Sequence, residues 1–536
     1  MTLGMAPRQG DLLDDLTRFC DAAVSKDSIY ALLHRERDQL FPDEFFADLF
    51  SDMGRRSVPP SVVATVMVLQ RLEGLSDREA VERFTFDTRW RYAAGLGGYD
   101  SEGPTRFVHT VLVEMRERLR RSNRPDRVFE VTLGAAAAAG VVGRRRRVLD
   151  STPLYDAVAT MDTVTLIRSA LRGLLAVAGP LEAGLRAACT SGDEYADAAK
   201  PQIDWEDAAA RDALIDSRAR DAFACLALLE GERLGPEVSR AAELLAAVVG
   251  QDLEKGDDGG FRIARRVAPD RIISTVDPEA RHGHKTNARG FDGYKGHIAI
   301  DPDAEVITSM SVTAGNVGDA AVAGELLKEC LGPGGPEDES TITDEAEPVE
   351  VYGDSAYGAG ALLNELDRAG ALAMVKVLAA TAPQGRFTKD EFVIDIAART
   401  VTCPNQMTVS YQVRANGAAS AYFGRACSAC PLRSRCTASS DGRVVDIGPY
   451  EAQLQAGRKR QKDAGWKKRY RATRPKVERK LAHLMRRRHG GRRARVRGRL
   501  RVAQDFLWLG AAVNLARLAV LGARSSSGGG WAIVGC

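Results

Sequence analysis

Three carboxylates have the residue types and positions that metal-dependent phosphodiester chemistry would use. Asp150 ends a short β-type segment, Asp354 follows the apolar stretch "VEVYG", and Glu478 lies almost alone among cations in a helical stretch. Phosphodiester cleavage can depend on two metal ions about 3.5–4 Å apart, with little covalent help from the protein. Mg²⁺ prefers oxygen ligands and keeps several waters, so that a few carboxylates suffice. The three residues are therefore candidate catalytic residues and candidate ligands of Mg²⁺ or Mn²⁺.

Each of these carboxylates also has an ordinary structural interpretation. Asp150 precedes a Ser-Thr pair and could cap a following helix, and Asp354 could begin an Asp-Ser turn. Glu478 could pair with Arg474, which lies four residues earlier. Residue types and spacing alone leave these alternatives open.

Four cysteines form a second candidate site. Cys427 and Cys430 are two residues apart, Cys436 follows, and Cys403 lies upstream in the same β-rich stretch. Zn²⁺ binds four thiolates tetrahedrally and stabilises segments that are too small for a core of their own. The N-terminus lacks the layout of a signal peptide, so we expect a cytoplasmic protein with reduced cysteines. The pattern predicts a structural zinc site, and four metal-free thiols are the alternative.

Positive charge is concentrated near the C-terminus. The formal net charge is only +3, but the segment 458–501 has 21 lysines and arginines against two acids, a local excess of 19. Such a segment is typical of binding to a polyanion, with nucleic acid as the leading candidate. A solvated or disordered basic tract is the alternative. No apolar run reaches the ~20 residues of a membrane-spanning helix, so we expect no membrane partner.

The elements around these residues predict an α/β fold. Residues 11 to about 125 have helical patterns, and Pro59-Pro60, Gly74 and Ser76 mark two helices joined by a turn, compatible with a helix-turn-helix DNA-binding unit. Around the aspartates we expect a strand with Asp150, a hairpin, a helix, a strand with Asp354, a helix and another strand. This order favours a mixed sheet with helices. Further predicted segments are a helical block from 154 to about 255, paired strands over 383–450, a C-terminal helix and a flexible tail.

An ordered set of motifs resembles a known family. The motifs are "RRRRVLDST", "DPEARHGHKTN", "FDGYKGHIAID", "VITSMSVTAGNVGDA", "VYGDSAYG" and "YRATRPKVERKLAHL". They resemble bacterial insertion-sequence transposases of the DDE type, in the branch with a cysteine-rich insertion before the glutamate. The resemblance runs from about residue 40 to about residue 520. It implies a ribonuclease H-like core with Asp150, Asp354 and Glu478 as its metal-binding catalytic triad, and zinc at Cys403, Cys427, Cys430 and Cys436.

The resemblance also implies DNA contacts. Tyr470 and Arg474 match the tyrosine and arginine of the family signature around Glu478, but Met485 occupies the place of its lysine. Arg486, the next residue, is the expected substitute as a phosphate contact. Pro475 predicts that a helix begins there, so that Tyr470 need not share its face.

Several other polar residues are weaker candidates. Lys285 and Lys295 are expected to contact DNA phosphates. The three histidines His282, His284 and His297 could contact DNA or a metal, or lie in exposed loops. Asp292, Asp301 and Asp319 are expected to be turn or surface residues.

The implied organisation is a helical DNA-binding domain, a divided catalytic core and a small β insertion. The expected boundaries are 1–130 for the N-terminal domain, 131–382 for the first part of the core with a helical insertion at about 154–260, 383–450 for the zinc-ribbon-like insertion, 451–522 for the C-terminal core helices and 523–536 for the tail.

The implied activity is metal-dependent cleavage of double-stranded DNA at the terminal inverted repeats, followed by strand transfer into target DNA. We expect at least a homodimer on DNA, in the cytoplasm of a bacterium and associated with the nucleoid. A degenerate transposase that only binds DNA, or a nuclease without strand transfer, are the alternatives.

Overall fold

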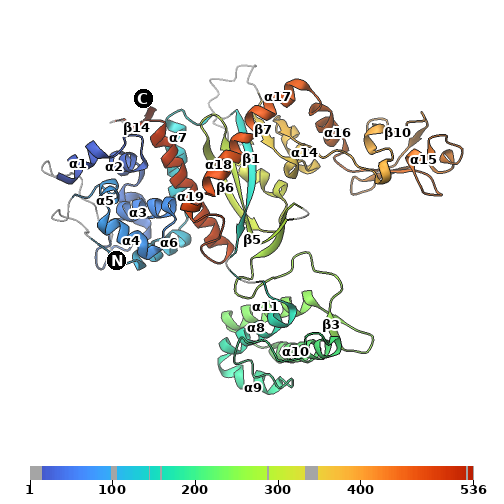
Figure 1. The fold of residues 1–536 in the computed structure, drawn as a ribbon, viewed down its shortest axis with the longest axis horizontal. Helices are drawn as coiled ribbons and strands as arrows, with labels where there is room; N and C mark the ends of the chain where they lie inside the picture. Colours follow the sequence, from blue (N-terminus) through green and yellow to red (C-terminus); the bar gives the residue numbers. More distant parts are fainter. Residues whose placement is uncertain are drawn as a thin grey trace.

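A mixed sheet lies at the centre of the molecule, between the N-terminal helices, a group of inserted helices and the cysteine-rich segment (Figure 1). The structure is a computed structural model that describes residues 15–97, 106–143, 145–156, 158, 160–286, 289–331, 348–526 and 529–534. The α/β class and the mixed sheet predicted from the order of patterns are confirmed.

The N-terminal part of the chain is helical, as its sequence patterns predict. Its helices are α1 (Asp15–Ala23), α2 (Ile29–Leu40), η1 (Asp43–Leu49), α3 (Pro60–Glu73), α4 (Asp77–Phe86), α5 (Thr88–Ala93), α6 (Thr110–Arg121) and α7 (Arg127–Ala138). Gly74 ends α3 in the left-handed conformation, with φ of 70°, and a Cβ there would lie 2.5 Å from the Arg488 carbonyl oxygen. Ser76 and Glu79 form a capping box at the start of α4. The predicted helix–turn–helix boundaries are confirmed.

Six strands form the central sheet. They are β1 (Arg146–Tyr155), β4 (Arg281–Thr286), β5 (Arg289–Asp301), β6 (Val306–Ala314), β7 (Glu350–Gly353) and β8 (Leu372–Val375). The strand order is β6-β5-β1-β7-β8, and β4 pairs with the first part of β5. Strand β5 is antiparallel to β1 and β6, whereas β1, β7 and β8 are parallel. The hairpin predicted before the second aspartate is β5–β6.

The first strand is longer than its sequence pattern indicates. It continues beyond Asp150 to Tyr155, because β5 pairs with it from Val148 opposite Ile300 to Tyr155 opposite Gly293. Gly293 has φ of 136°, and a Cβ there would lie 2.3 Å from the Leu154 carbonyl oxygen. The prediction that Asp150 ends a strand is therefore wrong, since it lies in the middle of one.

Helices before and after β7 cover the sheet and join it to the N-terminal helices. They are η3 (Asp319–Val322), α12 (Ala323–Leu326), α13 (Lys328–Leu331), η4 (Ser355–Tyr357), α14 (Gly360–Arg368), α16 (Glu451–Arg460), α17 (Ala464–Thr473), α18 (Pro475–Leu484), η8 (Arg487–His489) and α19 (Arg499–Val520). The α19 side chain Asn514 exchanges hydrogen bonds with the backbone N–H and C=O of Ile307 on β6, at 2.9 and 2.8 Å. Buried residues of α3, β6 and α19 belong to one continuous hydrophobic core.

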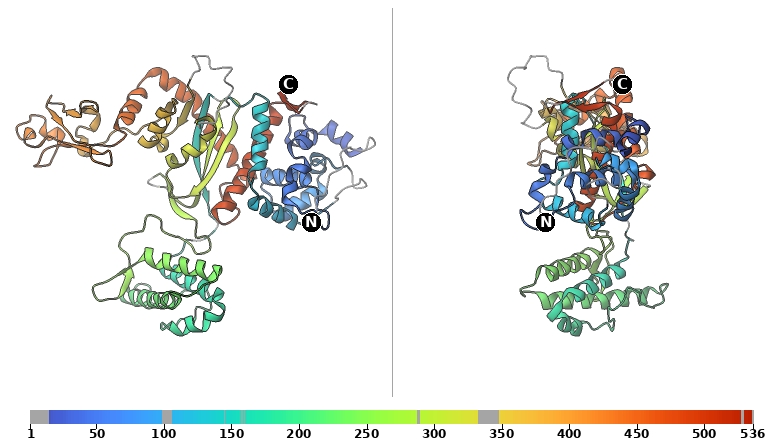
Figure 2. Two further views of the ribbon diagram at one scale, coloured as in Figure 1. Left: turned by 180° about the vertical axis from the view of Figure 1, so that it is seen from behind. Right: turned by 90° about the vertical axis from the view of Figure 1, so that its left-hand side faces the viewer.

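The inserted helices come between β1 and β4 in the sequence. In the views of Figures 1 and 2 they lie below the sheet. They are α8 (Thr163–Val177), η2 (Gly179–Leu181), α9 (Glu182–Ala188), α10 (Ala208–Leu229) and α11 (Pro236–Asp252), followed by β2 (Leu253–Lys255) and β3 (Phe261–Ile263). They bury a hydrophobic cluster of their own. Across the described ranges, no single helix is long and apolar enough to cross a membrane; the pair 163–177 and 179–188 meets that test only together, across a bend of 116°.

The cysteine-rich segment projects from the opposite side of the sheet from the N-terminal helices (Figures 1 and 2). It comprises η5 (Pro383–Gly385), η6 (Lys389–Glu391), β9 (Val393–Asp395), β10 (Thr400–Thr402), β11 (Thr408–Ser410), β12 (Ala419–Tyr422), η7 (Gly424–Cys427), α15 (Arg433–Cys436) and β13 (Val444–Ile447). The paired strands predicted here are confirmed, as β9–β10–β11 and β12–β13.

The C-terminal residues form a hairpin, β14 (Ala523–Ser525) and β15 (Trp531–Ile533). Ala523 is buried, and the backbone N–H and hydroxyl of Ser525 donate to the Glu36 carboxylate on α2. This packed hairpin differs from the flexible tail that the glycine and serine content predicts, because β14 finds a partner on α2.

Candidate active site

The parallel pairing of β1 and β7 brings two aspartates together. Val148 on β1 is opposite Tyr352 on β7. Asp150 and Asp354 each lie two residues further along, so that they reach the same level of the sheet. Asp354 directly follows the last residue of β7, and its carboxylate accepts a hydrogen bond from the Ala356 N–H at 2.9 Å. The turn interpretation of Asp354 thus holds, and it leaves the second carboxylate oxygen available for another contact, with Arg474 Nη2 at 3.8 Å.

Helix α18 brings the third carboxylate to the same place. The helix begins at Pro475, as its sequence predicts, and packs against β1. Val477, Leu481 and Leu484 are buried on its inner face. Glu478 lies in its first turn with its side chain 63% exposed, so that the amphipathic pattern of α18 places this carboxylate at the edge of the core.

One guanidinium lies among the three carboxylates. Arg474 Nη2 is 3.1 Å from an oxygen of Asp150 and 3.8 Å from one of Asp354. Its Nη1 is 3.5 Å from an oxygen of Glu478. The Arg474 side chain is only 6% exposed, and its Nε and Nη1 are buried without a hydrogen bond. The ion pair proposed as the ordinary role of Glu478 is therefore present, but the same arginine also contacts both aspartates.

Burial and surplus negative charge perturb this cluster. Burial raises the pKa of Asp150 to about 6, and nearby Asp354 adds to the rise while Arg474 opposes it. Burial alone would lower the pKa of Arg474, but the surrounding carboxylates outweigh it and raise that pKa. Three carboxylates facing one cation leave room for more positive charge.

The donor chemistry of the cluster fits a hard cation, because the three carboxylates offer only oxygen. Within the described part of the chain, however, no group of three or more His, Cys, Asp or Glu side chains is already arranged to hold a metal ion. Arg474 lies between the carboxylates instead.

Comparisons with known proteins now bear on this geometry. Residues 18–118 match the family described as a transposase domain (DUF772), and residues 402–519 match the family described as a transposase DDE domain. No curated protein and no solved structure matches the chain.

These two matches indicate an insertion-sequence DDE transposase. The substrate of such an enzyme is DNA, and enzymes of this type use a divalent metal. The matched segments contain Arg474 and Glu478 of the cluster, whereas Asp150 and Asp354 lie between the two segments.

A second set of polar side chains, around Asp319, lies next to the three carboxylates and is joined to β1 through Ser151. Asp319 accepts hydrogen bonds from the Ser151 hydroxyl at 2.7 Å and from Lys295 Nζ at 3.0 Å. Asp319, predicted as a turn or surface residue, does begin the 3-10 turn η3, but its side chain is only 11% exposed because these partners enclose it. Lys295, expected to contact DNA, is nearly buried and also donates to the Val317 carbonyl. Tyr357 is fully buried with its hydroxyl unbonded near these side chains.

The signature tyrosine of the transposase supports the strand that carries Asp354. Tyr470 lies on α17, separated from α18 by the break at Pro475. Its buried hydroxyl donates to the Gly353 carbonyl at 3.2 Å, and its ring stacks on Trp466. Burial raises its pKa to about 12. By contrast, Lys285 and Arg486 are exposed, so that DNA can reach both side chains.

The three candidate histidines, His282, His284 and His297, differ in burial. His297 is buried, with Nε2 2.9 Å from the Thr313 hydroxyl, and burial lowers its pKa to about 4. The exposed-loop interpretation is wrong for His297, since it lies on β5 inside the sheet. His282 pairs with Asp292 at 2.7 Å, and its ring lies against that of His284. Asp301 is a buried turn residue that accepts from the Asp303 and Ala304 N–H groups.

The four cysteines of the cysteine-rich segment line one small cavity of about 100 Å³. Cys427 and Cys436 are buried, while Cys403 and Cys430 are partly exposed. The backbone N–H of Arg443 donates to the Cys427 sulfur at 3.4 Å. Burial raises the pKa of the Cys436 thiol. Four sulfur donors fit zinc in their chemistry, although they are not yet arranged around one point.

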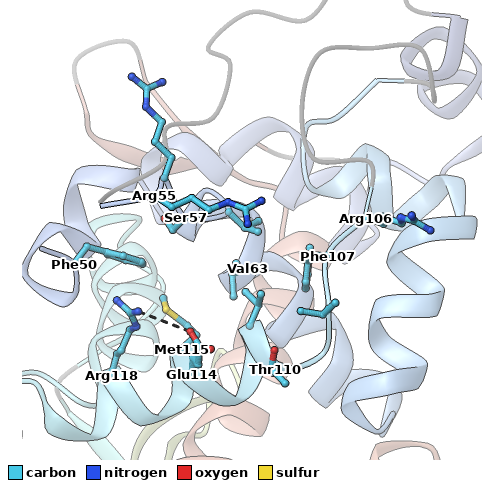
Figure 3. Close-up of a pocket in the computed structure, with 14 residues that line it drawn as sticks. Phe50, Arg55, Ser57, Val63, Arg106, Phe107, Thr110, Glu114, Met115 and Arg118 are labelled. Carbon is cyan, nitrogen blue, oxygen red and sulfur yellow. Dashed lines mark ion pairs between the residues drawn. The ribbon is translucent and has the colours of Figure 1, made fainter. Parts of the chain in front are cut away.

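A larger cavity of about 430 Å³ opens in the N-terminal helices, between the 50–58 segment and α6 (Figure 3). Its floor is apolar, with Val63 and Met115, and arginines surround its mouth. Arg118 packs on the Phe50 ring at 4.8 Å and pairs with Glu114 at 3.8 Å. Figure 3 shows Arg55 pointing away from this floor. The cavity has no ionisable cluster comparable to that around Arg474.

Proposed function

We propose that this transposase cuts double-stranded DNA at the terminal inverted repeats of its element and transfers the freed ends into target DNA. The observation that carries this proposal is the convergence of Asp150, Asp354 and Glu478, from three separate elements, on Arg474. Their function would be to hold two Mg²⁺ or Mn²⁺ ions, which would activate the attacking oxygen and stabilise the leaving oxygen.

The order of strands supports a ribonuclease H-like core. Of the five strands β6-β5-β1-β7-β8, only β5 runs against the others. In the proposed organisation, residues 1–130 are the DNA-binding domain, 131–382 and 451–522 form the core, and the helices at about 154–260 and the segment 383–450 are insertions.

The chain's own residues would position the DNA. In the first step, a water oxygen bonds to the phosphorus and the bond to the 3′ oxygen breaks, which leaves a 3′-hydroxyl and a 5′-phosphate. In the second, the oxygen of that 3′-hydroxyl bonds to a target phosphorus while the bond from that phosphorus to the target's 3′ oxygen breaks, which leaves a 3′-hydroxyl on the target strand. The two unbonded nitrogens of Arg474, Nε and Nη1, would donate to phosphate oxygens. The basic segment 458–501, including Arg486, would neutralise the backbone.

A transposase must hold two DNA ends together, so we propose a homodimer or larger assembly on DNA. Helices α3 and α4, joined at Gly74, would help to recognise the terminal repeats.

The decisive experiment compares wild type with Asp354→Asn in cleavage of duplex DNA that carries the ends of the element, with Mg²⁺. Asp354→Asn keeps the shape and removes the charge, and we expect cleavage to fall at least ~100-fold, since several kcal/mol of charge stabilisation is lost. Asp367→Asn on α14 is the matched control, because that aspartate is exposed and outside the cluster.

The outcomes separate the alternatives. Equal cleavage by wild type and Asp354→Asn would remove Asp354 from the site. DNA binding without cleavage by the wild type would favour a degenerate, DNA-binding protein. Cleaved ends that never join target DNA would favour a nuclease.

For the cysteine-rich segment, we propose a structural zinc bound by Cys403, Cys427, Cys430 and Cys436. Removal of zinc with a strong chelator should then unfold residues 387–447 ahead of the core, because zinc contributes folding free energy directly in small segments. Cys430→Ser should reproduce this loss, whereas Cys330→Ser, outside the segment, should not. Purified protein with less than one zinc per chain and unchanged stability in chelator would contradict the site.

A further inference from the structure

A polar cavity of about 240 Å³ lies where the N-terminal helices meet the start of α19. Helices α3 and α6 contribute one side, and the segment 495–508 contributes the other. Five arginines line it: Arg71, Arg116, Arg120, Arg495 and Arg501. Two carboxylates, Asp77 and Asp505, line it as well, and Glu117 outside the lining pairs with Arg120, so that two positive charges remain in excess.

The two carboxylates are already used by the deepest arginines. Arg71 Nε is 3.0 Å from an oxygen of Asp505, and Arg116 pairs with Asp77. Burial lowers the pKa of both Arg71 and Arg116, and the neighbouring Arg495 lowers them further. Like charges are therefore crowded here after the internal pairing is complete.

The other three arginines keep donors free toward the cavity. Arg120 gives Nη1 to the Gln504 side chain at 2.9 Å and Nη2 to Glu117, and Arg495 gives one N–H to the Leu75 carbonyl. Arg501 lines the cavity and is exposed, and its side chain makes no ion pair or hydrogen bond within the described ranges. Guanidinium groups that converge in this way match a compact anion with several acceptor oxygens.

We propose that this cavity binds a phosphate group. Its volume is below the range of ~300–1,000 Å³ of pockets for whole small molecules, which favours one phosphate over a complete nucleotide. The source is either the DNA backbone or free phosphate. The DNA source rests on the proposed function, and a backbone phosphate seated here would tie residues 18–118 to residues 402–519, the two matched segments.

The test uses full-length wild type, Arg501→Gln and Arg55→Gln. Arg55, exposed beside the cavity of Figure 3, loses the same charge elsewhere in the N-terminal helices. Without DNA, inorganic phosphate at constant ionic strength should raise the melting temperature of wild type and Arg55→Gln by about 2 °C, and that of Arg501→Gln by less. With DNA and no phosphate, Arg501→Gln should bind about tenfold more weakly and with a shallower salt dependence.

Both effects together assign the site to the DNA backbone. A phosphate effect without a DNA effect also supports the site, with free phosphate as its ligand. No difference between Arg501→Gln and Arg55→Gln in either arm overturns the proposal. Because the phosphate arm contains neither DNA nor divalent metal, it can succeed where cleavage fails, so that failure of the proposed function is recognised separately.

Discussion

Arginine and aspartate meet in two regions of this transposase, with opposite surpluses. Around Arg474, three carboxylates face one guanidinium. In the cavity beside α6, five guanidiniums face two carboxylates. Ion pairs of the same kind therefore leave negative charge uncompensated in one place and positive charge in the other. The sign of the surplus indicates the ligand each region can accept: a cation in the first and an anion in the second.

The two regions also differ in how fully their buried arginines are hydrogen-bonded. Arg474 is buried with its Nε and Nη1 unbonded, so that it has donors to give although it is surrounded by acids. Arg71 in the cavity has its Nε and Nη1 engaged with Asp505 and the His489 carbonyl. An anion would thus bind to Arg474 only after a metal cation has bound the three carboxylates around it. The cavity, by contrast, can bind an anion directly.

The largest effect is expected on removal of the one cation in the negative region. Arg474→Met should lower the free energy of unfolding by about 4 kcal/mol without divalent metal, because it leaves buried carboxylates uncompensated. Mg²⁺ should recover more stability in this variant than in wild type. Urea unfolding with and without Mg²⁺ measures this, with the exposed Arg471→Met as control. A loss equal to that of Arg471→Met would show that the three carboxylates do not depend on Arg474.

A smaller effect is expected from pH, and only in the negative region. The pKa of Asp150 in the folded chain is raised to about 6, above its ordinary value of 3.8. The folded state therefore holds this proton more tightly than the unfolded state. Its stabilising contribution is present at pH 4 and is lost as the pH rises to about 6. Relative to Asp150→Asn, metal-free wild type should lose on the order of 2 kcal/mol across that range.

Urea unfolding of both proteins between pH 4 and pH 7 checks this difference. Parallel stability curves would contradict the raised pKa. The cavity should not contribute, because arginines keep their protons throughout this range.

The smallest effect is expected from a substitution that removes one negative charge from the arginine-lined cavity. Asp505→Asn leaves Arg71 a neutral partner and should lower the free energy of unfolding by about 1.5 kcal/mol, the order of one hydrogen bond to a charged group. Inorganic phosphate should offset this loss, and Mg²⁺ should not. Thermal unfolding in each ion measures both responses, and recovery by Mg²⁺ instead would break the contrast between the two regions.

Local sequence patterns predicted the structure correctly wherever interactions between residues close in the sequence decide it. Gly74 and Ser76 mark the turn between α3 and α4, and Pro475 marks the start of α18. The hairpin β5–β6 follows from alternation and a turn sequence. The candidate carboxylates could be chosen for the same reason, since a lone acid in a basic helix and an aspartate after an apolar strand are visible in sequence.

Patterns failed where pairing with a distant strand decides the outcome. The polar residues after Asp150 predict the end of a strand, but pairing with β5 extends that strand to Tyr155. The local pattern favours a turn or surface position for Asp319 and allows an exposed loop for His297. In the structure Asp319 is enclosed by Ser151 and Lys295, and His297 is buried within the sheet. Lys295 is expected from the sequence to contact DNA, but in the structure it is nearly buried and donates to Asp319.

By itself, the sequence determined the order of elements, their boundaries at proline, glycine and serine, and the types of the reactive side chains. Only the tertiary structure decided which charges meet. The parallel register of β1 and β7 sets Asp150 level with Asp354, and α18 adds Glu478 around Arg474. Arg71 and Asp505 are 434 residues apart in the chain. No local pattern encodes such a contact, because it arises only when α3 and α19 pack on one core.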